Sequence, residues 1–499
     1  MANVTSLQSI IFHKPANTPL IAFTGVVLLL TILTAGWYTP SGSFLGVFDL
    51  HRAWKFLARR YDFMRSSAHQ RTLTRFRVVQ HRVIALSGTD FRKFFFNDGK
   101  LAWREAYLVL MSGMPEVTDI DMHEQVTDDA VRKRTVQLFS PSRLECLRPA
   151  FLEHMQTQMD RWGSSGKFAV FEDVFSLIYQ FTVHMTTCRE LAHNPEDLRH
   201  LYEYYYTIES SSTPFSMMFP WIRSPALGRK RQATEKLVGL LMKYIQLRRE
   251  SKTMSTDAFD VCINDGISDQ EIIEFVLETI FAGVINTGVN ACWILVYLGF
   301  NPEWKDKITT EIYTLLDAHA PVTGPGDTIE SRLASVPTSA WDDSMPMLDL
   351  AIREVLRLIT ASITLLRRNK LRDLKLGAEP IPKDAFLAYN LSDIHFDPSV
   401  YSDPMSFDPS RFSAERAEGK EVPNAFLGWG AGRHPCLGLK VAKLEMKIIV
   451  AHVLGAFKYT IVDGNGTPLK QAPIHDRNNI HKAKPLGDPC YIKYERKTK

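Results

Sequence analysis

The sequence predicts a mainly α fold with small β-sheets, an α+β layout dominated by helix, that follows one N-terminal transmembrane helix. Three observations support this class. Residues 76–86 are rich in β-branched residues and predict two short strands. A capping box at Ser268–Glu271 opens an apolar run that ends before Pro302 and predicts a helix of about thirty residues. The last forty or so residues return to strands and turns, with Asp463–Gly466 as a hairpin signal.

The composition is that of a folded protein. Of the 499 residues 45% are hydrophobic and 23% charged, which excludes a disordered chain, a collagen-like repeat and a polytopic transporter. The 59 basic and 55 acidic residues nearly balance, so the charge gives no reason to expect nucleic acid as a partner. The six cysteines form no CxxC pair, which favours a reducing compartment with one or two functional thiols.

Residues 18–39 carry no charged side chain, and their number matches the ~20 residues that a helix needs to cross a bilayer. Trp37 and Tyr38 stand at the end of this span, and more basic residues follow it than precede it. The positive-inside rule therefore predicts a lumenal tail at 1–17, a transmembrane helix at 18–39 and a cytosolic body at 40–499. A cleaved signal peptide is the alternative. Sugar on the sequons at Asn390 or Asn465 would reverse this topology.

The most informative stretch is residues 426–438, which we call the cysteine loop. It places Cys436 on a glycine-rich loop ahead of an amphipathic helix. Backbone N–H groups and the helix dipole would favour the thiolate there, and the glycines would let a flat cofactor approach the backbone. Arg433 and His434 could meet anionic groups. A buried structural cysteine is the simpler reading, but three glycines in register with an aromatic residue make it untenable.

The cysteine loop resembles the haem-binding signature of the cytochrome P-450 superfamily. The matching residues are Trp429, Gly430, Gly432, His434, Cys436 and Gly438. The resemblance implies the cytochrome P-450 fold and haem b, iron protoporphyrin IX, with Cys436 as the axial thiolate ligand of the iron. It also implies that His434 lies near a haem propionate. The form Gly-Arg-His-Pro-Cys resembles the eukaryotic sterol 14α-demethylase branch more than it does most other branches.

Two further motifs of this family follow the expected order. Glu354 and Arg357 resemble its ExxR element and Arg411 its PxRF element, so the three are expected to form a charge triad that holds the cysteine loop and takes no part in catalysis. Arg367 and Arg132 are the expected propionate partners, with Arg367 ranked first. In the run 132–134 the resemblance does not decide whether Arg132 or Arg134 contacts the haem.

The centre of the long helix departs from the family pattern. Ala282 and Gly283 match and are expected to leave room for O2 over the iron. Ile285 and Asn286 replace the acid and alcohol that usually relay protons. Either Asn286 and Thr287 hold an ordered water chain in their place, or a hydroxyl of the substrate helps. Asn286 could instead merely cap a helix kink.

Residues 213–222 carry six large apolar side chains and precede a basic run. By resemblance they link two lid helices, and we expect a substrate entrance that dips into the membrane, with Met218 and Phe219 as contacts.

The sequence is thus identified as that of a membrane-anchored haem-thiolate monooxygenase of the endoplasmic reticulum, with residues 40–499 as its cytosolic catalytic domain. It shows no flavin or nicotinamide fingerprint, so electrons are expected from NADPH–cytochrome P-450 reductase, or from a cytochrome b-type donor. The reductase is expected to dock near Lys440, Lys443 and Lys447.

The expected substrates besides O2 are apolar small molecules such as a sterol, terpenoid or polyketide, in a tailoring step of secondary-metabolite or sterol biosynthesis. Two alternatives stay open at this point: a haem-thiolate isomerase that needs neither O2 nor a reductase, and a haem- or lipid-binding membrane protein without catalysis.

Overall fold

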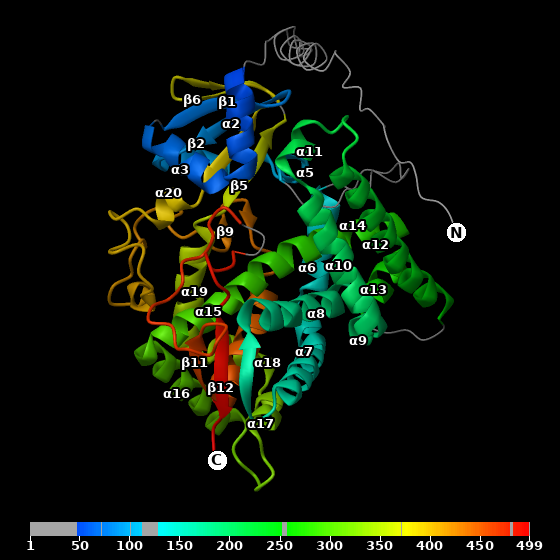
Figure 1. Cartoon of the computed structure of the whole chain (residues 1–499), viewed down its shortest axis with the longest axis vertical. Helices are drawn as coiled ribbons and strands as arrows, with labels where there is room; N and C mark the ends of the chain where they lie inside the picture. Colours follow the sequence, from blue (N-terminus) through cyan, green and yellow to red (C-terminus); the bar gives the residue numbers. More distant parts are fainter. Residues whose placement is uncertain are drawn as a thin grey trace, which may run out of the picture.

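The computed structural model describes residues 47–70, 72–99, 101–111, 128–251, 257–370, 372–479 and 483–498. The predicted tail at 1–17 and transmembrane helix at 18–39 lie outside these residues. In the described part a large helical body carries small sheets at two places (Figure 1), as the sequence predicts. One described helix, Asp269–Phe300, is long and apolar enough to cross a membrane, but 72% of its apolar window is buried inside the fold. It is therefore a core helix.

The largest sheet has the strand order β1-β2-β8-β5-β3. These strands are β1 (Leu73–Val78), β2 (His81–Leu86), β8 (Phe386–Asn390), β5 (Thr364–Asn369) and β3 (Leu101–Ala102). β2 and β8 run parallel and the other pairs antiparallel. The two strands predicted within 76–86 are confirmed, with the first starting at Leu73. Helices α2 (Val47–Ala58) and α3 (Arg60–Gln70) pack beside this sheet.

The long central helix is confirmed and has three parts. Helix α14 (Asp269–Gly283) continues into a π-helical turn, η3 (Val284–Gly288), and then into α15 (Val289–Phe300). The capping box forms as predicted, because Ser268 accepts from the backbone of Glu271 and the Glu271 side chain accepts from the backbone of Ser268. The π turn lies at the centre of the helix, next to Gly283 and Gly288. Glycine is a poor helix former, so the regular α-helical hydrogen bonds are weakest there.

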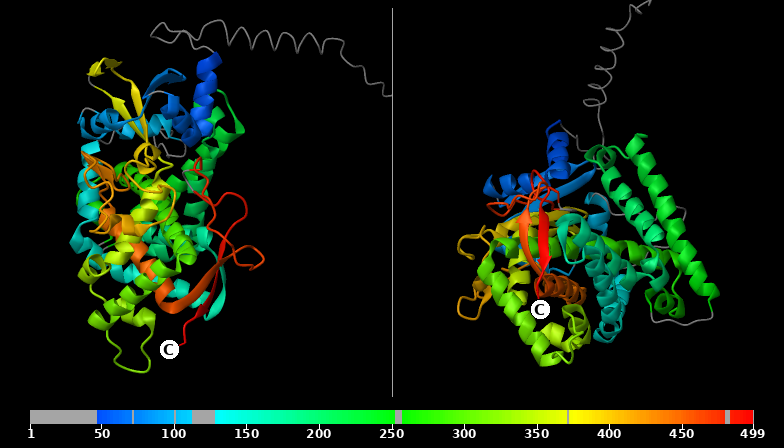
Figure 2. Two further views of the ribbon diagram at one scale, coloured as in Figure 1. Left: turned by 90° about the vertical axis from the view of Figure 1, so that its left-hand side faces the viewer. Right: turned by 60° about the horizontal axis from the view of Figure 1, so that its bottom comes forward.

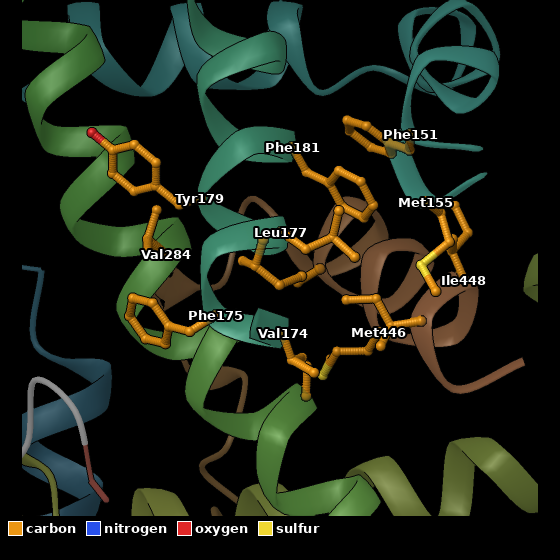
Figure 3. Close-up of a cluster of buried hydrophobic side chains, with 14 of the residues drawn as sticks. Phe151, Met155, Val174, Phe175, Leu177, Tyr179, Phe181, Val284, Met446 and Ile448 are labelled. Atoms are coloured by element: carbon orange, nitrogen blue, oxygen red, sulfur yellow. The ribbon is translucent and has the colours of Figure 1, made fainter. Parts of the chain in front are cut away.

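The hydrophobic core surrounds this helix. Helix α8 (Phe175–Thr186) lies between the central helix and two further helices, α7 (Pro141–Trp162) and α21 (Leu439–Ala456) (Figure 3). The rings of Phe151 and Phe181 stack with centroids 4.8 Å apart. At Gly288 an added Cβ would lie 3.0 Å from the ring of Phe175, so this glycine lets α8 approach the π turn closely.

The C-terminal sheet, with the order β11-β12-β4, differs from the predicted hairpin. Its strands are β11 (Phe457–Val462), β12 (Tyr491–Arg496) and β4 (Ser165–Ala169), seen edge-on in Figure 2. The turn at Asp463–Gly466 forms but closes only a single bridge, between Val462 and Pro468. Proline has no N–H to extend that ladder, and β11 pairs instead with the distant β12.

The remaining elements connect and cover this core. They are α4 (Thr89–Asn97), α5 (Arg104–Leu110), α6 (Asp128–Leu138), η2 (Val170–Val174), α9 (Arg189–His193), α10 (Pro195–Ser211), α11 (Pro214–Met218), α12 (Pro225–Glu250), α13 (Ala258–Asn264), α16 (Pro302–His319), α17 (Ile329–Ser335), α18 (Thr338–Asp343), α19 (Pro346–Thr360), β6 (Leu374–Leu376), β7 (Glu379–Ile381), α20 (Ser392–His395), η4 (Pro409–Phe412), β9 (Gly430–Ala431) and β10 (His434–Pro435).

Candidate active site

The cysteine loop is a tight hairpin whose shape only glycine permits. β9 and β10 pair through Ala431 with His434 and Gly430 with Pro435. Gly432 has a φ of 61°, and an added Cβ there would lie 2.2 Å from the carbonyl oxygen of Phe96 at the end of α4. Steric contact and left-handed backbone thus both exclude a side chain at Gly432.

Cys436 lies at the end of this hairpin, two residues before Gly438, the N-cap of α21. Its N–H donates to the carbonyl oxygen of Trp429 at 2.7 Å, which closes the loop. Its side chain is accessible to solvent, yet burial raises the pKa of the thiol and a hydrogen bond from the backbone of Gly438 only partly opposes this. The sequence prediction that the loop favours the thiolate is therefore wrong for the protein alone; the sulfur needs a cation beside it.

Cations gather around His434 on the same loop. Burial, then Arg367 and Arg132, and lastly Arg433 lower the pKa of His434 to about 4. Arg367 is buried on β5, while Arg132 is exposed on α6. The guanidinium of Arg433 lies against Gly99, where a Cβ would meet it at 2.7 Å.

The structure distinguishes the two arginines of the 132–134 run. Arg134 is buried, lies 3.9 Å from the carboxylate of Glu271 and faces the ring of Phe275 on α14. Arg132 is the one that lies near His434. Among the described residues, no carboxylate is in ion-pair contact with Arg132 or Arg433. Cations without a carboxylate partner beside a glycine hairpin that carries a thiol fit a flat iron cofactor that carries carboxylates of its own.

The charge triad that the sequence predicts is assembled and fully buried. Arg357 donates to both carboxylate oxygens of Glu354, each at 2.8 Å, and Arg411 donates to the same carboxylate at 3.0 Å. None of the three side chains is more than 1% exposed. Arg357 also donates to the carbonyl oxygens of His395 and Pro404, so the triad ties α19 to the segment that leads to the cysteine loop.

His395 is a structural link that sequence reasoning missed. Its Nδ1–H donates to the carbonyl oxygen of Arg357 at 3.0 Å, and its Nε2 accepts from the N–H of Leu427 in the cysteine loop at 2.9 Å. Burial and then the charge of Arg357 lower the pKa of His395 to about 3. The neutral ring therefore joins the triad to the loop. A lone histidine 41 residues before Cys436 carries no motif, so the sequence holds no signal for this role.

The centre of the helix presents one amide to open space. Ala282 and Asn286, one turn apart, are accessible, whereas Ile285 and Thr287 are buried. The Asn286 amide donates to the carbonyl oxygen of Ala282 at 2.7 Å, and Asn290 donates to that of Asn286 at 2.7 Å. The π turn packs against α21, the helix that follows Cys436. This places Asn286, rather than Thr287, as the polar group of the accessible face.

Gly283 is half-buried on the central helix, and a Cβ built on it points toward α8. That Cβ would make an ordinary van der Waals contact with the methyl group of Thr182, 3.4 Å away. The expectation that Gly283 leaves room for O2 stays a prediction. Of the expected small pair, Ala282 alone faces the accessible side.

The apolar segment 213–222 is divided between core and surface. Met218 is buried against the sheet that holds β1 and β2, whereas Phe215, Trp221 and Ile222 are exposed. Trp54 on α2 is exposed as well, and α2 and α11 pack together. Met218 is therefore not a surface contact.

The expected docking lysines differ in exposure. Lys440 is exposed, and Lys443 pairs with Asp349 at 3.0 Å. Lys447 is 1% exposed and donates to the carbonyl oxygen of Trp341 at 2.8 Å, so the expectation that it faces a partner is wrong. A cleft of about 400 Å³ lies here, lined among others by Glu145, Thr338, Asp342, Lys440 and Lys443.

Comparison with known proteins gives a consistent answer. A family model described as cytochrome P450 matches residues 56–481. The chain is 26% identical to the cytochrome P450 monooxygenase nsrP of Aspergillus novofumigatus, over 79% of this chain and 77% of that protein. It is 25% identical to the sterol 14-demethylase of Arabidopsis thaliana, over 77% and 78%.

Among solved structures, the retinoic acid-bound cyanobacterial CYP120A1 superposes with a TM-score of 0.69 at 21% identity, over 87% of this chain and 94% of that one. That likeness shows the fold. The two relatives are almost equally distant, so the resemblance of the cysteine loop to the sterol 14α-demethylase branch remains a minor feature.

Proposed function

The chain belongs to the cytochrome P450 family, and from this premise we propose that Cys436 binds the haem iron of a membrane-associated monooxygenase that oxidises an apolar small molecule. Membership of the family brings a cysteine-ligated haem, monooxygenase activity with O2, and a redox partner. The observation that supports Cys436 most strongly is its place at the end of a glycine hairpin beside a group of cations.

The residues of the chain divide the work of holding the haem. The Cys436 sulfur would be the iron ligand, and the Gly438 N–H beside it would stabilise the negative charge. Arg367, Arg132 and His434 would hold the two carboxylates, with Arg367 buried and Arg132 near the surface. The bound haem would supply the activation of O2 for the insertion of one oxygen atom into the substrate.

Asn286 is the residue that we propose for oxygen handling. Its amide nitrogen is held by the carbonyl oxygen of Ala282, so the side-chain oxygen has a fixed direction and can accept from a water molecule on the accessible face. An amide is not an acid at neutral pH, so the proton must come through that water. Thr287 is buried and takes no part.

The proposed substrate is a sterol, terpenoid or polyketide, and the proposed reaction is a tailoring step in secondary metabolism or sterol biosynthesis. The accessible helix face supports an apolar ligand, because it offers the methyl group of Ala282 beside a single amide. The similarity to several fungal cytochrome P450 monooxygenases at 25–27% identity supports a monooxygenase reaction of this kind.

We further propose a single-pass anchor at 18–39 in the endoplasmic reticulum membrane, with the catalytic domain in the cytosol. The exposed aromatic side chains of Trp54 and Trp221 lie on two segments that pack together, which supports contact of this end with a lipid surface. Of the two sequons, Asn390 is buried and donates to Thr364, so only Asn465 reports on topology.

Electrons would come from NADPH–cytochrome P-450 reductase or a cytochrome b-type donor. The cleft beside Lys440 supports docking at this face, since an exposed lysine can meet an acidic partner. Replacing Lys440 by Glu should slow reduction of the haem by the reductase, with reduction by dithionite as the control.

The function is tested in a host that co-expresses a reductase and is fed candidate lipids. We expect a product that contains one atom from labelled O2 and requires NADPH, and no product from the Cys436→Ala variant. A product that forms without O2 or NADPH would instead identify an isomerase. Absence of any lipid-derived product across sterol, terpenoid and polyketide feeds would contradict the proposed substrate class.

A further inference from the structure

Three histidines gather where α7, α8 and α9 meet. His154 on α7, His184 on α8 and His193 on α9 each place one ring nitrogen within 4.8 Å of the others. The Nε2 of His154 and the Nδ1 of His184 are 2.9 Å apart, and both rings are buried. His193 closes the group from the surface, with its ring centroid 4.7 Å from that of His154.

The outer histidine is oriented as metal ligands usually are. Its Nδ1–H donates to the carbonyl oxygen of Arg189 at 2.9 Å, so Nε2 carries the lone pair. A ligating histidine characteristically donates its second N–H to a backbone carbonyl or carboxylate in this way. The carboxylate of Glu153 lies 3.4 Å from this Nε2 and supplies a further oxygen ligand.

We propose that His154, His184 and His193 bind one divalent cation of borderline softness, such as Zn²⁺, with Glu153 or water as the fourth ligand. Three imidazoles and a carboxylate or water form a donor set that suits zinc. The site is separate from Cys436, and it would fasten the short helix α9 to α7 and α8.

The distances allow this with small movements. Two nitrogens bound to Zn²⁺ at about 2.0–2.1 Å in a tetrahedral site lie about 3.3–3.4 Å apart. The buried pair, 2.9 Å apart, must therefore separate by about 0.5 Å. The nitrogens of the group lie within 4.8 Å of one another, so His193, which stands on a short helix, must move inward by up to about 1.4 Å. The ring that donates in the His154–His184 hydrogen bond switches its proton to its other nitrogen, so no net proton is released.

The local charges partly oppose and partly favour a cation. Arg189 and Arg143 lie close enough to His184 to lower its pKa, whereas Glu153 acts in the opposite direction. The hydrogen bond between His154 and His184 needs one acceptor nitrogen, so at least one of these two rings offers a lone pair within the group. Packing between His154 and His184 alone would not require His193. The ring of His193 adds a lone pair on Nε2 beside the carboxylate of Glu153, as a metal site requires.

The test uses the haem-loaded full-length protein, freed of its affinity tag and stripped with a chelator, and titrates it with ZnCl2 in a calorimeter. We expect one equivalent to bind. His193→Ala should weaken binding at least 30-fold without loss of folding, because His193 lies at the surface, and Glu153→Gln about 3- to 10-fold.

Two matched controls separate this site from other zinc ligands. His200→Ala removes an exposed histidine on α10, and Cys146→Ser removes an exposed thiol on α7; both should bind Zn²⁺ as the wild type does. X-ray absorption at the zinc edge should show nitrogen and oxygen ligands. Unchanged binding in His193→Ala, or loss of binding in Cys146→Ser alone, would overturn the proposal.

Discussion

The cysteine loop and the π turn of the central helix are both expected to face the haem, but they are constrained in different ways. The loop is determined by its backbone: Gly432 has no space for a Cβ, and the Cys436 N–H is bonded within the loop. The π turn depends on side chains, with the Asn286 and Asn290 amides bonded to helix carbonyl groups. The loop keeps every residue of its motif, whereas the helix has exchanged an acid and an alcohol for Ile285 and Asn286. Iron binding thus tolerates little change, while proton delivery can pass to water held by another polar group.

The largest effect is expected from the buried triad behind the loop. Glu354→Gln leaves the charges of Arg357 and Arg411 without their carboxylate in the core, which should lower the free energy of unfolding by about 3–5 kcal/mol. Urea unfolding of the haem-loaded protein measures this. Arg75→Gln, which breaks an exposed pair with Glu379, is the control and should cost less than about 1 kcal/mol. Equal costs for the two variants would show that the triad does not support the loop.

The next effect concerns the loop backbone. Gly432→Ala forces a Cβ into the carbonyl oxygen of Phe96 at a positive φ, and we expect a loss of about 2–3 kcal/mol together with reduced haem content. Gly466→Ala, at a φ of 85° in a turn where no atom lies within 4 Å of the added Cβ, is the matched control. Haem occupancy after purification reports the difference. Full occupancy in Gly432→Ala would mean that the loop is more adaptable than its geometry indicates.

The histidine that joins loop and triad should make stability depend on pH. The pKa of His395 is about 3 in the folded protein, below its ordinary value of 6.5. Between these two pH values the folded state binds fewer protons than the unfolded state, so the free energy of unfolding falls as the pH falls. The contribution of His395 to the free energy of unfolding is complete above pH 6.5 and has decreased by about 2 kcal/mol at about pH 5.

His395→Gln can keep both hydrogen bonds but cannot titrate. Other buried histidines contribute to the wild-type slope, so the informative quantity is the difference between the two proteins. We expect the variant to lose less stability between pH 6.5 and about 5 than the wild type does. Parallel profiles would exclude His395 as a titrating link.

The smallest effect is expected at the π turn. Asn286→Ala removes the amide that orients water and should lower the product formed per NADPH consumed about tenfold, while haem binding stays intact. Asn286→Thr restores a hydroxyl and should lose less. Thr287→Ala is the control, since its side chain is buried away from the accessible face. An equal loss in Asn286→Ala and Thr287→Ala would place the relay on the whole turn rather than on Asn286.

Sequence alone predicts those parts of this molecule that depend on local signals. The capping box at Ser268 and the stop at Pro302 bound the central helix, and the paired strands at 73–86 follow from β-branched composition. The turn at Asp463–Gly466 is confirmed and closes a short hairpin, but the local signal does not predict that β11 pairs along its length with β12, a strand far along the chain.

In the candidate site, too, the sequence predicts the features that depend on local signals and misses those that depend on tertiary packing. The loop and triad residues can be found from spacing, but the directions of side chains cannot. Gly283 turned out to face α8, Lys447 is buried, and Arg132 rather than Arg134 lies near His434, all because of tertiary packing. His395 has no sequence signal, since its two bonds join segments that meet only in the folded protein.

The most direct test of the account is the absorption spectrum of the purified, reduced protein with carbon monoxide. We predict the red-shifted band of a thiolate-ligated haem in the wild type, and loss of that band in Cys436→Ala, with Cys146→Ser unchanged as the matched thiol control. An imidazole-type spectrum in the wild type, or a thiolate band that persists in Cys436→Ala, would contradict it.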